Sequence, residues 1–509
     1  MRPLMPIMNT ASFQPPRELQ QLLDAITLLA SDAGVTAYVV GGTVRDVLLG
    51  REARDLDLAV DRDAMAFAKR LAATFGAHFV ELDDVNVVAR VVMARGHDAA
   101  VDYVDVAQLQ GTLEQDLRRR DFTIDALAVP LGQASVIDVC GGLDDLAARA
   151  VRMNASDVFD ADPLRLLRAA RIASELGFAI DARTQDVIRA RAGDVVQAAA
   201  ERRRDELARI FALDDAYQAL LLLDGLKLLD ALLPEVTFGR GVGQPPQWHA
   251  YDVFEHGLRA VEAMDIMLAP AAPVGAGAWL WEGLWKAFAW CEGELRAYLA
   301  EELSEGRTRG SLLKVAALLH DVAKPQTRTV DDDGRARFYG HADAGAATAA
   351  RVMRRLRFSA SEVRFVSRLV AEHLRPVQLA QVGEAPTRRA LYRFYRALGD
   401  AVPGVLLLAL ADAAASRGPS MTSEAWSRHV AYMNSLLVRS MEEEGIVDPP
   451  RLLTGNDVMR ELGMPAGPAI GKLLEALREA QAAGDVNDRE AALAFVRAAR
   501  NTAEGTPGI

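Results

Sequence analysis

Two aspartates in one short apolar stretch are the residues whose types and spacing most directly predict chemistry. Residues 54–58 read Arg-Asp-Leu-Asp-Leu, and successive side chains of a β-strand point to opposite faces. Asp55 and Asp57 therefore share one face, while the leucines point into a core. Two carboxylates on one strand face have the geometry to hold Mg²⁺ between themselves and a triphosphate, as in two-metal phosphoryl transfer.

A double glycine and an Arg-Asp pair precede these aspartates in residues 41–46. Gly41 and Gly42 allow a phosphate to approach the backbone closely. Arg45 and Asp46 fall at an expected helix start, where free N–H groups favour an anion. A D-x-D pair alone is more often a solvated surface feature, so the combination is what favours a nucleotide site.

A third carboxylate is expected from a neighbouring strand, within residues 101–106. We prefer Asp105, which valines flank, and Asp102 is the alternative. Three consecutive arginines, residues 118–120, then come directly before Asp121. Such a run is usually a solvated surface, but here it adjoins an apolar stretch of the same domain. We therefore expect it to reach triphosphate or ribose.

A second set of residues predicts a metal centre in the C-terminal half. The doublet His320-Asp321 ends an apolar helical stretch, with His256 before it and Asp412 after it. A lone helical histidine is more often a packed core residue, but the whole set favours metal binding. Imidazole and carboxylate ligands suit Mn²⁺, Fe²⁺, Ni²⁺ or Zn²⁺. Five of the eight histidines lie in this region: His249, His256, His320, His341 and His373.

A mixed α/β segment must position the first set of residues. We expect an amphipathic helix over 17–35 and strands over 37–40, 55–60, 86–93 and 100–106, so the first ~145 residues form one α/β domain. Beyond residue 162, alanine and leucine dominate at helical spacing and strand signals nearly vanish. The predicted fold class is therefore α+β, with an α/β head and a helical body.

Composition limits the classes of protein that this chain can belong to. Its 509 residues suggest three or four domains, and the net charge of −12 argues against diffuse attraction to nucleic acid. Two cysteines cannot form a disulfide framework. We find no apolar run of 18 residues and no signal-type N-terminus, so we expect a cytoplasmic protein with no membrane partner.

Several longer motifs together resemble the bacterial tRNA nucleotidyltransferase and poly(A) polymerase family, within the polymerase-β-like nucleotidyltransferases. They are GGTVRD at 41–46, the D-L-D pair, RRDFTIDALA at 119–128, residues 161–178, residues 199–210 and residues 452–474. The resemblance covers most of the chain. It implies a polymerase-β-like head followed by all-α neck, HD and C-terminal helical domains.

The same resemblance implies roles for individual residues. Asp55 and Asp57 would bind Mg²⁺, Gly42 and Arg45 would contact nucleotide phosphates, and Arg120 and Asp121 would lie near ribose and phosphate. Asp162 and Arg165 would read the base edge of CTP or ATP in place of a nucleic-acid template. The residues themselves agree, since Asp162 suits a helix cap, Pro163 a first helical position, and Leu164 and Leu167 a core. Arg168 and Arg171 continue along this helix toward the nucleotide.

Other features bear on the reaction. The family often has Glu at position 161, here Ala, and usually Asn at position 125, here Asp. Only residues 107–115 separate the third-carboxylate strand from the next motif, where many relatives that add complete CCA carry a flexible loop. A short loop resembles enzymes that add only the two cytidines. Complete CCA, partial addition and poly(A) synthesis therefore remain alternatives.

The histidine pattern H…HD…D resembles the HD metal-dependent phosphohydrolases, with His341 and His373 as the further ligands of two-metal versions. Lys324, after the doublet, is expected to meet a substrate phosphate. A rival interpretation makes the head a vestigial RNA-binding module and the HD domain the working enzyme. The Trp-rich segment 267–309 is either simple packing, which we favour, or a partner surface.

The resemblance also implies partners and a division into domains. The partners are tRNA or another RNA 3′ end, CTP and ATP, with no DNA expected. Phosphate contacts would come from basic segments at 118–120, 165–171, 202–204 and 351–357. The expected domains are a tail (1–16), the head (17–145), the neck (146–238), the HD domain with its insertion (239–430) and the C-terminal domain (431–509).

Overall fold

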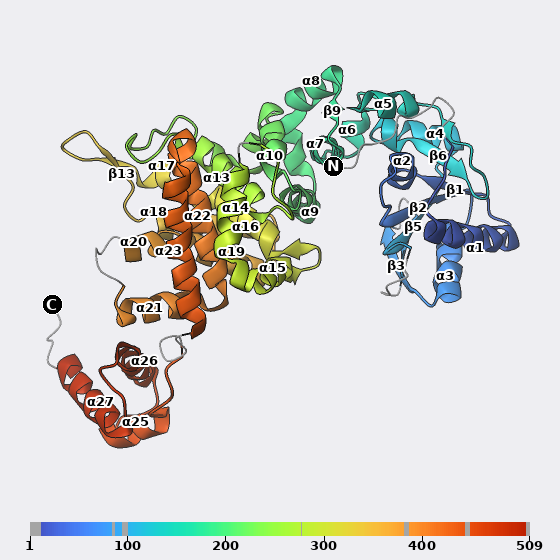
Figure 1. Ribbon diagram of the computed structural model, residues 1–509. Helices are drawn as coiled ribbons and strands as arrows, with labels where there is room; N and C mark the ends of the chain where they lie inside the picture. The colour runs from blue at the N-terminus through green and yellow to red at the C-terminus, as the bar shows by residue number, and fades with distance from the viewer. Residues whose placement is uncertain are drawn as a thin grey trace. The chain divides into compact units, whose positions relative to one another are not determined.

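The computed structural model describes residues 12–83, 87–93, 100–275, 277–380, 386–442 and 448–504. The chain forms two compact units (Figure 1). Unit 1 comprises Met1–Glu206 and Leu221–Leu232, and unit 2 comprises Leu207–Leu220 and Leu233–Ile509. Each unit is described by itself.

A seven-stranded mixed sheet with strand order β3-β4-β5-β2-β1-β6-β7 organises unit 1. Strands β2 and β5 pair in parallel, and the other neighbours pair antiparallel. Helix α3 (Ala64–Phe75) packs on β3, β4 and β5, and α1 (Arg17–Ala33) packs on α3. The strands are β1 (Ala37–Val40), β2 (Asp55–Val60), β3 (His78–Asp83), β4 (Val88–Val92), β5 (Tyr103–Gln108), β6 (Leu127–Pro130) and β7 (Ile137–Asp138).

Several of these elements agree with the bounds predicted from the sequence. The helix expected over 17–35 is α1, and the strands expected over 37–40 and 55–60 are β1 and β2 with those bounds. The strand expected over 86–93 is β4, and residue 86 lies outside the described residues. Strand β5 starts at Tyr103, later than expected, and β3, β6 and β7 were not expected.

Helices complete unit 1 beyond the sheet. α2 (Gly42–Leu48) follows β1 directly, as expected for the Arg45-Asp46 pair. α7 (Leu164–Leu176) buries Leu164 and Leu167, which confirms the predicted core face of this helix. The other α-helices are α4 (Leu113–Arg118), α5 (Gly142–Ala148), α6 (Val158–Ala161), α8 (Ala182–Arg191) and α11 (Leu228–Leu232). Two more, α9 (Ala200–Phe211) and α10 (Ala216–Gly225), each belong partly to unit 1 and partly to unit 2.

Unit 2 is built mainly from helices around α22 (Val402–Arg417), whose side chains are mostly buried. Helices α13 (Val253–Leu268), α16 (Arg309–Leu319) and α19 (Ala360–Glu372) all contact α22. The stretch Arg388–Ser420 is long and apolar enough to cross a membrane by length and composition, and 61% of its most apolar window is buried inside the protein. Such burial is what a core helix of a folded domain requires.

The Trp-rich segment packs within unit 2. Helix α14 (Ala278–Ala287) lies against α23 (Ser423–Glu442). The indole N–H groups of Trp281, Trp285 and Trp426 donate to backbone carbonyls at 3.0–3.1 Å. Trp290 donates to Asn434 Oδ1 at 2.8 Å. Because buried indoles need such partners, these contacts favour the packing interpretation of this segment.

The last three described helices have a core of their own, centred on Val458, Leu477 and Val496. They are α25 (Gly455–Leu462), α26 (Pro468–Ala483) and α27 (Arg489–Glu504). Helix α26 also contacts α21 (Arg388–Leu398) through ion pairs such as Arg393–Glu479 at 2.6 Å.

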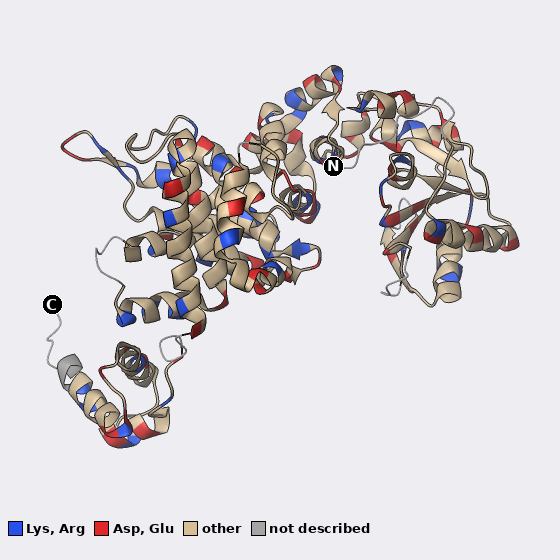
Figure 2. Cartoon of the chain, in the orientation of Figure 1, with Lys and Arg blue, Asp and Glu red and all other residues tan. Residues whose placement is uncertain are grey.

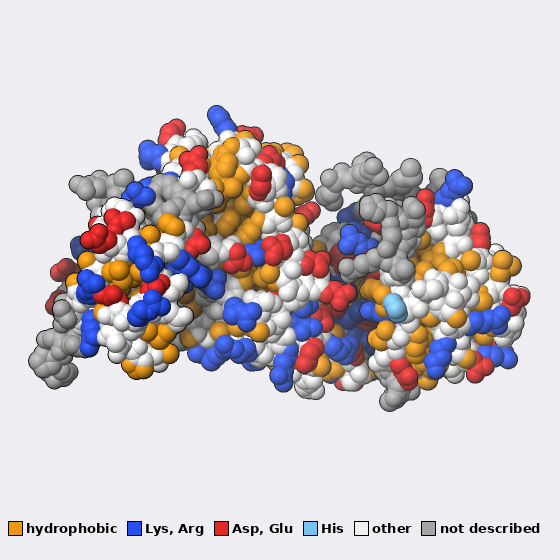
Figure 3. All heavy atoms as spheres, turned by 90° about the horizontal axis from the view of Figure 1, so that it is seen from below, with side chains coloured by type: hydrophobic (Ala, Val, Ile, Leu, Met, Phe, Trp, Pro, Cys, Tyr) orange, Lys and Arg blue, Asp and Glu red, His pale blue; other side chains and the backbone are white. Residues whose placement is uncertain are grey.

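Charged side chains of both signs are interspersed along the helices and strands (Figure 2). On the face seen in Figure 3, Lys and Arg side chains lie among acidic and apolar ones. The net charge of −12 is therefore an average over a mixed surface, and it leaves local basic groups on that face.

Candidate active site and metal centre

The sheet register brings three carboxylates together on neighbouring strands. Asp57 on β2 lies directly beside Asp105 on β5 in the parallel ladder, and Asp55 lies beside Tyr103. Partners in a ladder share one face of the sheet, so Asp55, Asp57 and Asp105 project from the same face. Asp102, the alternative, precedes β5 and is exposed. The structure thus places Asp105 next to the D-L-D pair.

Thr43 at the start of α2 ties the helix to this strand. Its hydroxyl donates to the backbone oxygen of Asp55 at 3.0 Å and accepts from the backbone N–H of Asp57 at 2.9 Å. The side chain is buried. One hydroxyl therefore fixes the backbone at both aspartates.

Gly41 lets the turn before α2 pass close to the carboxylates. Its φ of +71° lies in the region that favours glycine. A Cβ at this position would lie 3.0 Å from Asp57 Oδ2 and 3.0 Å from Arg120 Nη1. The predicted need for glycine thus has a physical cause, and the Arg120 guanidinium reaches the same turn.

The electrostatics of Asp57 fit a divalent cation. Burial raises the pKa of Asp57 to about 6, and the negative charges of Asp105 and Asp55 add to that rise while Arg120 opposes it. Crowded carboxylate oxygens are the ligands that Mg²⁺ prefers, and a bound cation would relieve their repulsion. Asp55 and Asp57 are therefore suitable metal ligands.

Arg45 is more enclosed than a phosphate-binding arginine was expected to be. Its side chain is 8% exposed and contacts Asp46 (Nε–Oδ1, 2.9 Å) and Asp125 (Nη1–Oδ1, 2.6 Å). Burial disfavours its charge, but the carboxylates of Asp125 and Asp46 outweigh burial and raise the pKa of Arg45. Arg45 is thus tied to Asp125, the residue at which this chain departs from the family pattern.

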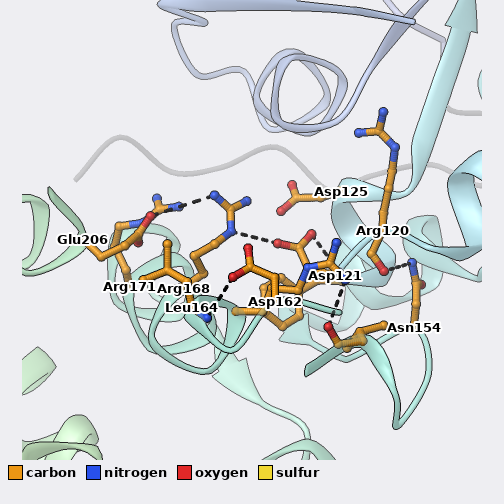
Figure 4. A network of polar contacts seen from close by, with 12 residues as sticks. Arg120, Asp121, Asp125, Asn154, Asp162, Leu164, Arg168, Arg171 and Glu206 are labelled. Atoms are coloured by element: carbon orange, nitrogen blue, oxygen red, sulfur yellow. Dashed lines mark hydrogen bonds and ion pairs between the residues drawn. The ribbon is translucent and has the colours of Figure 1, made fainter. Parts of the chain in front are cut away.

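Helix α7 links the head to α9 through alternating charges (Figure 4). Arg168 Nε lies 2.9 Å from Asp121 Oδ2, and Arg171 Nε lies 2.6 Å from Glu206 Oε2 on α9. Burial raises the pKa of Asp121, but the guanidiniums of Arg168 and Arg165 outweigh burial and lower it. These contacts hold Asp121 ionised and order the arginines of α7.

The two residues expected to read the base lie at the start of α7. Helix α7 begins at Leu164 with Pro163 as its N-cap, so Asp162 and Pro163 each lie one position earlier than their predicted roles require. Asp162 accepts from the N–H of Leu164 at 3.1 Å. Both of its oxygens also face Arg202 of α9, at 3.1 and 2.7 Å. Arg165 Nη1 donates to the backbone oxygens of Val158 (3.0 Å) and Arg119 (3.3 Å).

Six side chains of unit 2 form a buried cluster with metal-ligating atoms. The Nε2 atoms of His256 and His320 are 3.0 Å apart, and Asp412 Oδ1 lies 3.2 Å from His256 Nε2. On the other side, Asp321 Oδ1 lies 3.3 Å from His341 Nε2 and 3.7 Å from His373 Nε2. The structure therefore brings together all the predicted residues of the metal centre: His256, His320, Asp321, His341, His373 and Asp412.

The backbone orients three of these imidazoles. Nδ1 of His320, His341 and His373 each lies 2.7–2.8 Å from the carbonyl oxygen three residues earlier. A ring that donates its Nδ1–H in this way presents an unprotonated Nε2, which is the form that binds a metal. Nε2 of His341 and His373 and Oδ1 of Asp321 are buried without a hydrogen-bond partner among the described residues. The donor set therefore fits a transition metal.

Lys324 and His249 border this cluster. Lys324 Nζ contacts Asp321 Oδ2 at 2.5 Å and Gln244 Oε1 at 2.6 Å. His249 Nδ1 lies 3.2 Å from Ser416 Oγ, which donates to Asp412. His249 is thus beside the ligands but outside the three ligand groups found among the described residues.

Sequence reasoning missed several residues that hold the site together. Asp116 is buried and binds the arginines at 119 and 120. Arg202 was noted only within a basic segment expected to contact phosphate, and Glu206 only within the motif at 199–210. Arg90 was also missed, although it is the one charged residue in the apolar run 87–92, a signal from which a special role could have been inferred. Thr43 gave no signal beyond its place inside the GGTVRD motif at 41–46.

Three family models match the chain. The model described as "Poly A polymerase head domain" matches residues 37–152, "Probable RNA and SrmB- binding site of polymerase A" matches 177–238, and "HD domain" matches 294–416. Together with the carboxylates on the mixed sheet, they define the class: the protein is a nucleotidyltransferase with a polymerase head and an HD domain.

Curated relatives cover nearly the whole chain. An A-adding tRNA nucleotidyltransferase of Deinococcus radiodurans is 36% identical over 478 residues, which are 93% of this chain and 96% of the relative. A CC-adding tRNA nucleotidyltransferase of Thermus thermophilus is 34% identical over 485 residues, with coverage of 92% and 96%. This chain therefore belongs to the bacterial tRNA nucleotidyltransferase and poly(A) polymerase family.

Solved structures share the fold. A CCA-adding enzyme in complex with ATP has a TM-score of 0.58 at 20% identity, with 97% of each chain covered. The Thermotoga maritima CCA-adding enzyme complexed with tRNA has a TM-score of 0.55 at 20% identity, with 96% of each chain covered. These likenesses confirm the predicted α+β class with a polymerase-type head.

Proposed function

We propose that the protein adds C, A or both from CTP and ATP to the 3′ end of tRNA, with Mg²⁺, and releases pyrophosphate. The observation that carries the proposal is the register that sets Asp105 beside Asp57 on the face that also bears Asp55. Relatives over nearly the whole chain are named for adding A or CC to tRNA. Solved structures of similar fold are titled as complexes with ATP and with tRNA.

In this proposal, each of these residues of the head has its own role in nucleotide transfer. Asp55 and Asp57 would hold Mg²⁺, which supplies positive charge against the triphosphate. Asp105 would accept the proton of the RNA 3′-hydroxyl, which attacks the α-phosphorus as pyrophosphate leaves. Gly41 and Gly42 leave the backbone open to phosphate, and the buried Arg45, paired with Asp46, would order the turn. Arg120 and Asp121 would meet phosphate and ribose.

Base selection falls to α7 in this proposal. Asp162 and Arg165 would hydrogen-bond the base edge, and Arg168 and Arg171 would hold the helix in place. Arg202 occupies both oxygens of Asp162, and its side chain is 52% exposed. We infer that Arg202 gives way when a base arrives, because an exposed ion pair is weak and easily exchanged.

The deciding experiment uses tRNAs that end before the CCA, after one C and after both Cs, each with all four nucleoside triphosphates. Sequencing the product 3′ ends separates the alternatives. Addition of CC, of A or of CCA supports tRNA end addition and names the product. A long A tract identifies poly(A) polymerase, and no incorporation with any substrate refutes the proposal.

A second candidate function is metal-dependent phosphohydrolysis in unit 2. The convergence of four Nε2 atoms and two carboxylates favours it, and Lys324 would bind the substrate phosphate. The test is metal-dependent release of phosphate from RNA with a terminal phosphate, in wild type and in His320→Ala. Release that survives His320→Ala would refute this function, and release without any nucleotide incorporation would favour the vestigial-head alternative.

Location and domain boundaries remain proposals as well. We infer a cytoplasmic enzyme, because tRNA end addition belongs to that compartment. Divisions at residues 145, 238 and 430 are supported in part by the family match that ends at 238. Limited proteolysis followed by mass mapping of the fragments checks them.

A further inference from the structure

One of the three carboxylates, Asp105, is paired with an arginine to which the proposed function gives no role. Arg90 on β4 lies directly opposite Asp105 on β5 in the antiparallel register. Its Nε and Nη2 lie 2.8 Å from Asp105 Oδ1 and Oδ2, respectively. The guanidinium also stacks on Tyr103, with Cζ 3.7 Å from the ring centroid. The three side chains thus form one unit, in which the ring supports the guanidinium and the guanidinium holds the carboxylate.

We propose that Arg90 is a positioning residue for nucleotide transfer, which holds the carboxylate of Asp105 beside Asp57. This inference rests on the proposed function, because it gives the third carboxylate of that site its support. Arg90 itself touches neither nucleotide nor RNA in this proposal. Its effect on the reaction passes through Asp105 alone.

The arrangement of charges across the sheet favours this role. Arg90, Asp105 and Asp57 are register partners on adjacent strands, and the Arg120 guanidinium lies beyond Asp57 at the Gly41 turn. Asp105 and Asp57 are like charges that lie side by side in the ladder, so they repel each other. An arginine on each side of the carboxylate pair offsets this repulsion. Without Arg90, Asp105 is left free to turn away from Asp57.

A contribution to stability alone does not explain this unit. The Arg90 and Asp105 side chains are 32% and 21% exposed, and ion pairs this accessible contribute little to stability. A lysine would also neutralise Asp105, but it has neither a planar fork for two oxygens nor a face to stack on Tyr103. Arginine is the side chain that fixes the plane of the carboxylate as well as its charge.

The experiment measures incorporation of the nucleotide that the wild type adds, on a truncated tRNA, in Arg90→Gln, Arg90→Lys, Asp105→Asn and the double variant Arg90→Gln/Asp105→Asn. We expect Arg90→Gln to lower kcat about 10- to 100-fold, the range that misplacement of a catalytic group costs, with the KM for nucleotide unchanged. Arg90→Lys should recover part of the rate. The matched control is Arg62→Gln, which removes an exposed arginine paired with Asp61 at the end of β2.

The double variant decides whether Arg90 acts through Asp105. If it does, adding Arg90→Gln to Asp105→Asn lowers the rate no further. The proposal would be overturned if the rate losses of the two single variants multiply in the double variant, or if Arg90→Gln changes only KM. Full activity of Arg90→Lys or of Asp105→Asn would also overturn it. Thermal midpoints equal to that of the Arg62→Gln control exclude a folding defect, and Arg90→Lys supplies a folded comparison if Arg90→Gln is unstable.

The same assay separates this inference from the proposed function. A wild-type protein that adds no nucleotide would refute the function itself. A wild-type protein that adds nucleotide, together with Arg90→Gln at the wild-type rate, would refute only the role of Arg90.

Discussion

The carboxylates on the sheet of unit 1 and the histidine cluster of unit 2 gather metal-ligating groups in opposite ways. On the sheet, the ligand atoms are oxygens of half-buried side chains, and Arg90 and Arg120 balance their charge from the sides. In the cluster, three imidazoles that are 0–9% exposed are oriented by hydrogen bonds from Nδ1 to the backbone carbonyl three residues earlier. The first arrangement suits an ion that exchanges readily, and the second suits an ion that remains tightly bound.

Ligand chemistry agrees with this contrast. Mg²⁺ is bound through a few carboxylates and substrate phosphates and keeps several waters, so it exchanges with its nucleotide. Nitrogen ligands with fixed orientations bind transition metals far more tightly. The two sites should therefore respond differently to substitution and to chelation.

We expect the largest effect from removing a carboxylate ligand of the sheet site, a change that should leave the histidine cluster intact. Asp57→Ala removes a ligand outright and should lower incorporation by about 10³-fold or more, because metal stabilisation of developing charge contributes several kcal/mol. Incorporation of labelled nucleotide and elemental analysis of the dialysed protein measure the two sites together. Asp61→Asn, at the end of the same strand, is the matched control. Loss of the tightly held metal in Asp57→Ala would contradict the independence of the two sites.

The reciprocal change breaks the second site. His320→Ala removes an Nε2 shared by two of the candidate ligand groups, so metal retained after dialysis should fall by more than the 10- to 100-fold typical of an outer-shell change. Nucleotide incorporation should persist. The control is His429→Ala, a half-buried histidine of α23 that belongs to none of the candidate ligand groups. Equal metal content in both variants would argue against the cluster as a metal centre.

A smaller effect is expected from loosening the backbone that carries Asp55 and Asp57. Thr43→Val keeps the shape but leaves the backbone groups at Asp55 and Asp57 without their hydroxyl partner, a cost of about 1–3 kcal/mol for a buried group. We expect kcat to fall about 10-fold with little change in the KM for nucleotide. Thr27→Val, on helix α1, loses a hydroxyl contact away from the carboxylates and should keep full activity. Full activity of Thr43→Val would remove its assigned role.

The smallest effect concerns stability without metal. Because the folded pKa of Asp57 is about 6 rather than 3.8, the folded state binds the extra proton between these values. The free energy of unfolding in EDTA should therefore fall as pH rises from about 4 to 6 and then level off. The full shift corresponds to about 3 kcal/mol, and solvent screening of this half-buried side chain should reduce the change to about 1–2 kcal/mol. Asp57→Asn should lack this loss and be more stable than wild type at pH 7.5 in urea denaturation. Saturating Mg²⁺ should narrow the difference, and a variant less stable at that pH would contradict the charge repulsion.

Local patterns predicted the residues that carry the chemistry. Alternation along 55–60 placed Asp55 and Asp57 on one face, and flanking valines singled out Asp105. His256, the doublet His320-Asp321 and Asp412 followed from residue types in helical stretches. His341 and His373 followed from the resemblance to HD phosphohydrolases, and the structure brings all six residues together. The strand signals lie within a few residues of each other, where strand geometry determines direction, whereas the metal-centre residues are spread over positions 256–412.

The supporting contacts depend on pairings that a single sequence does not specify. Arg90 meets Asp105 only because β4 pairs with β5 in one register, and nothing in residues 86–93 specifies that register. Glu206 meets Arg171 across 35 positions of the chain. Arg45 was expected to face phosphate, but its Nη1 lies 2.6 Å from Oδ1 of Asp125, a residue 80 positions later in the sequence. Such long-range partners decide how much of each side chain remains for a ligand.

The tryptophans have a spectroscopic consequence. All six lie between residues 248 and 426, within unit 2, and unit 1 has none. Selective indole excitation therefore produces emission from unit 2 alone, whereas circular dichroism records the helices of both units. The packed indoles between α14 and α23 make that emission an optical reporter of one half of the molecule. Superimposable melting curves by the two signals would mark cooperative unfolding, and separated curves would give each unit its own transition without any added label.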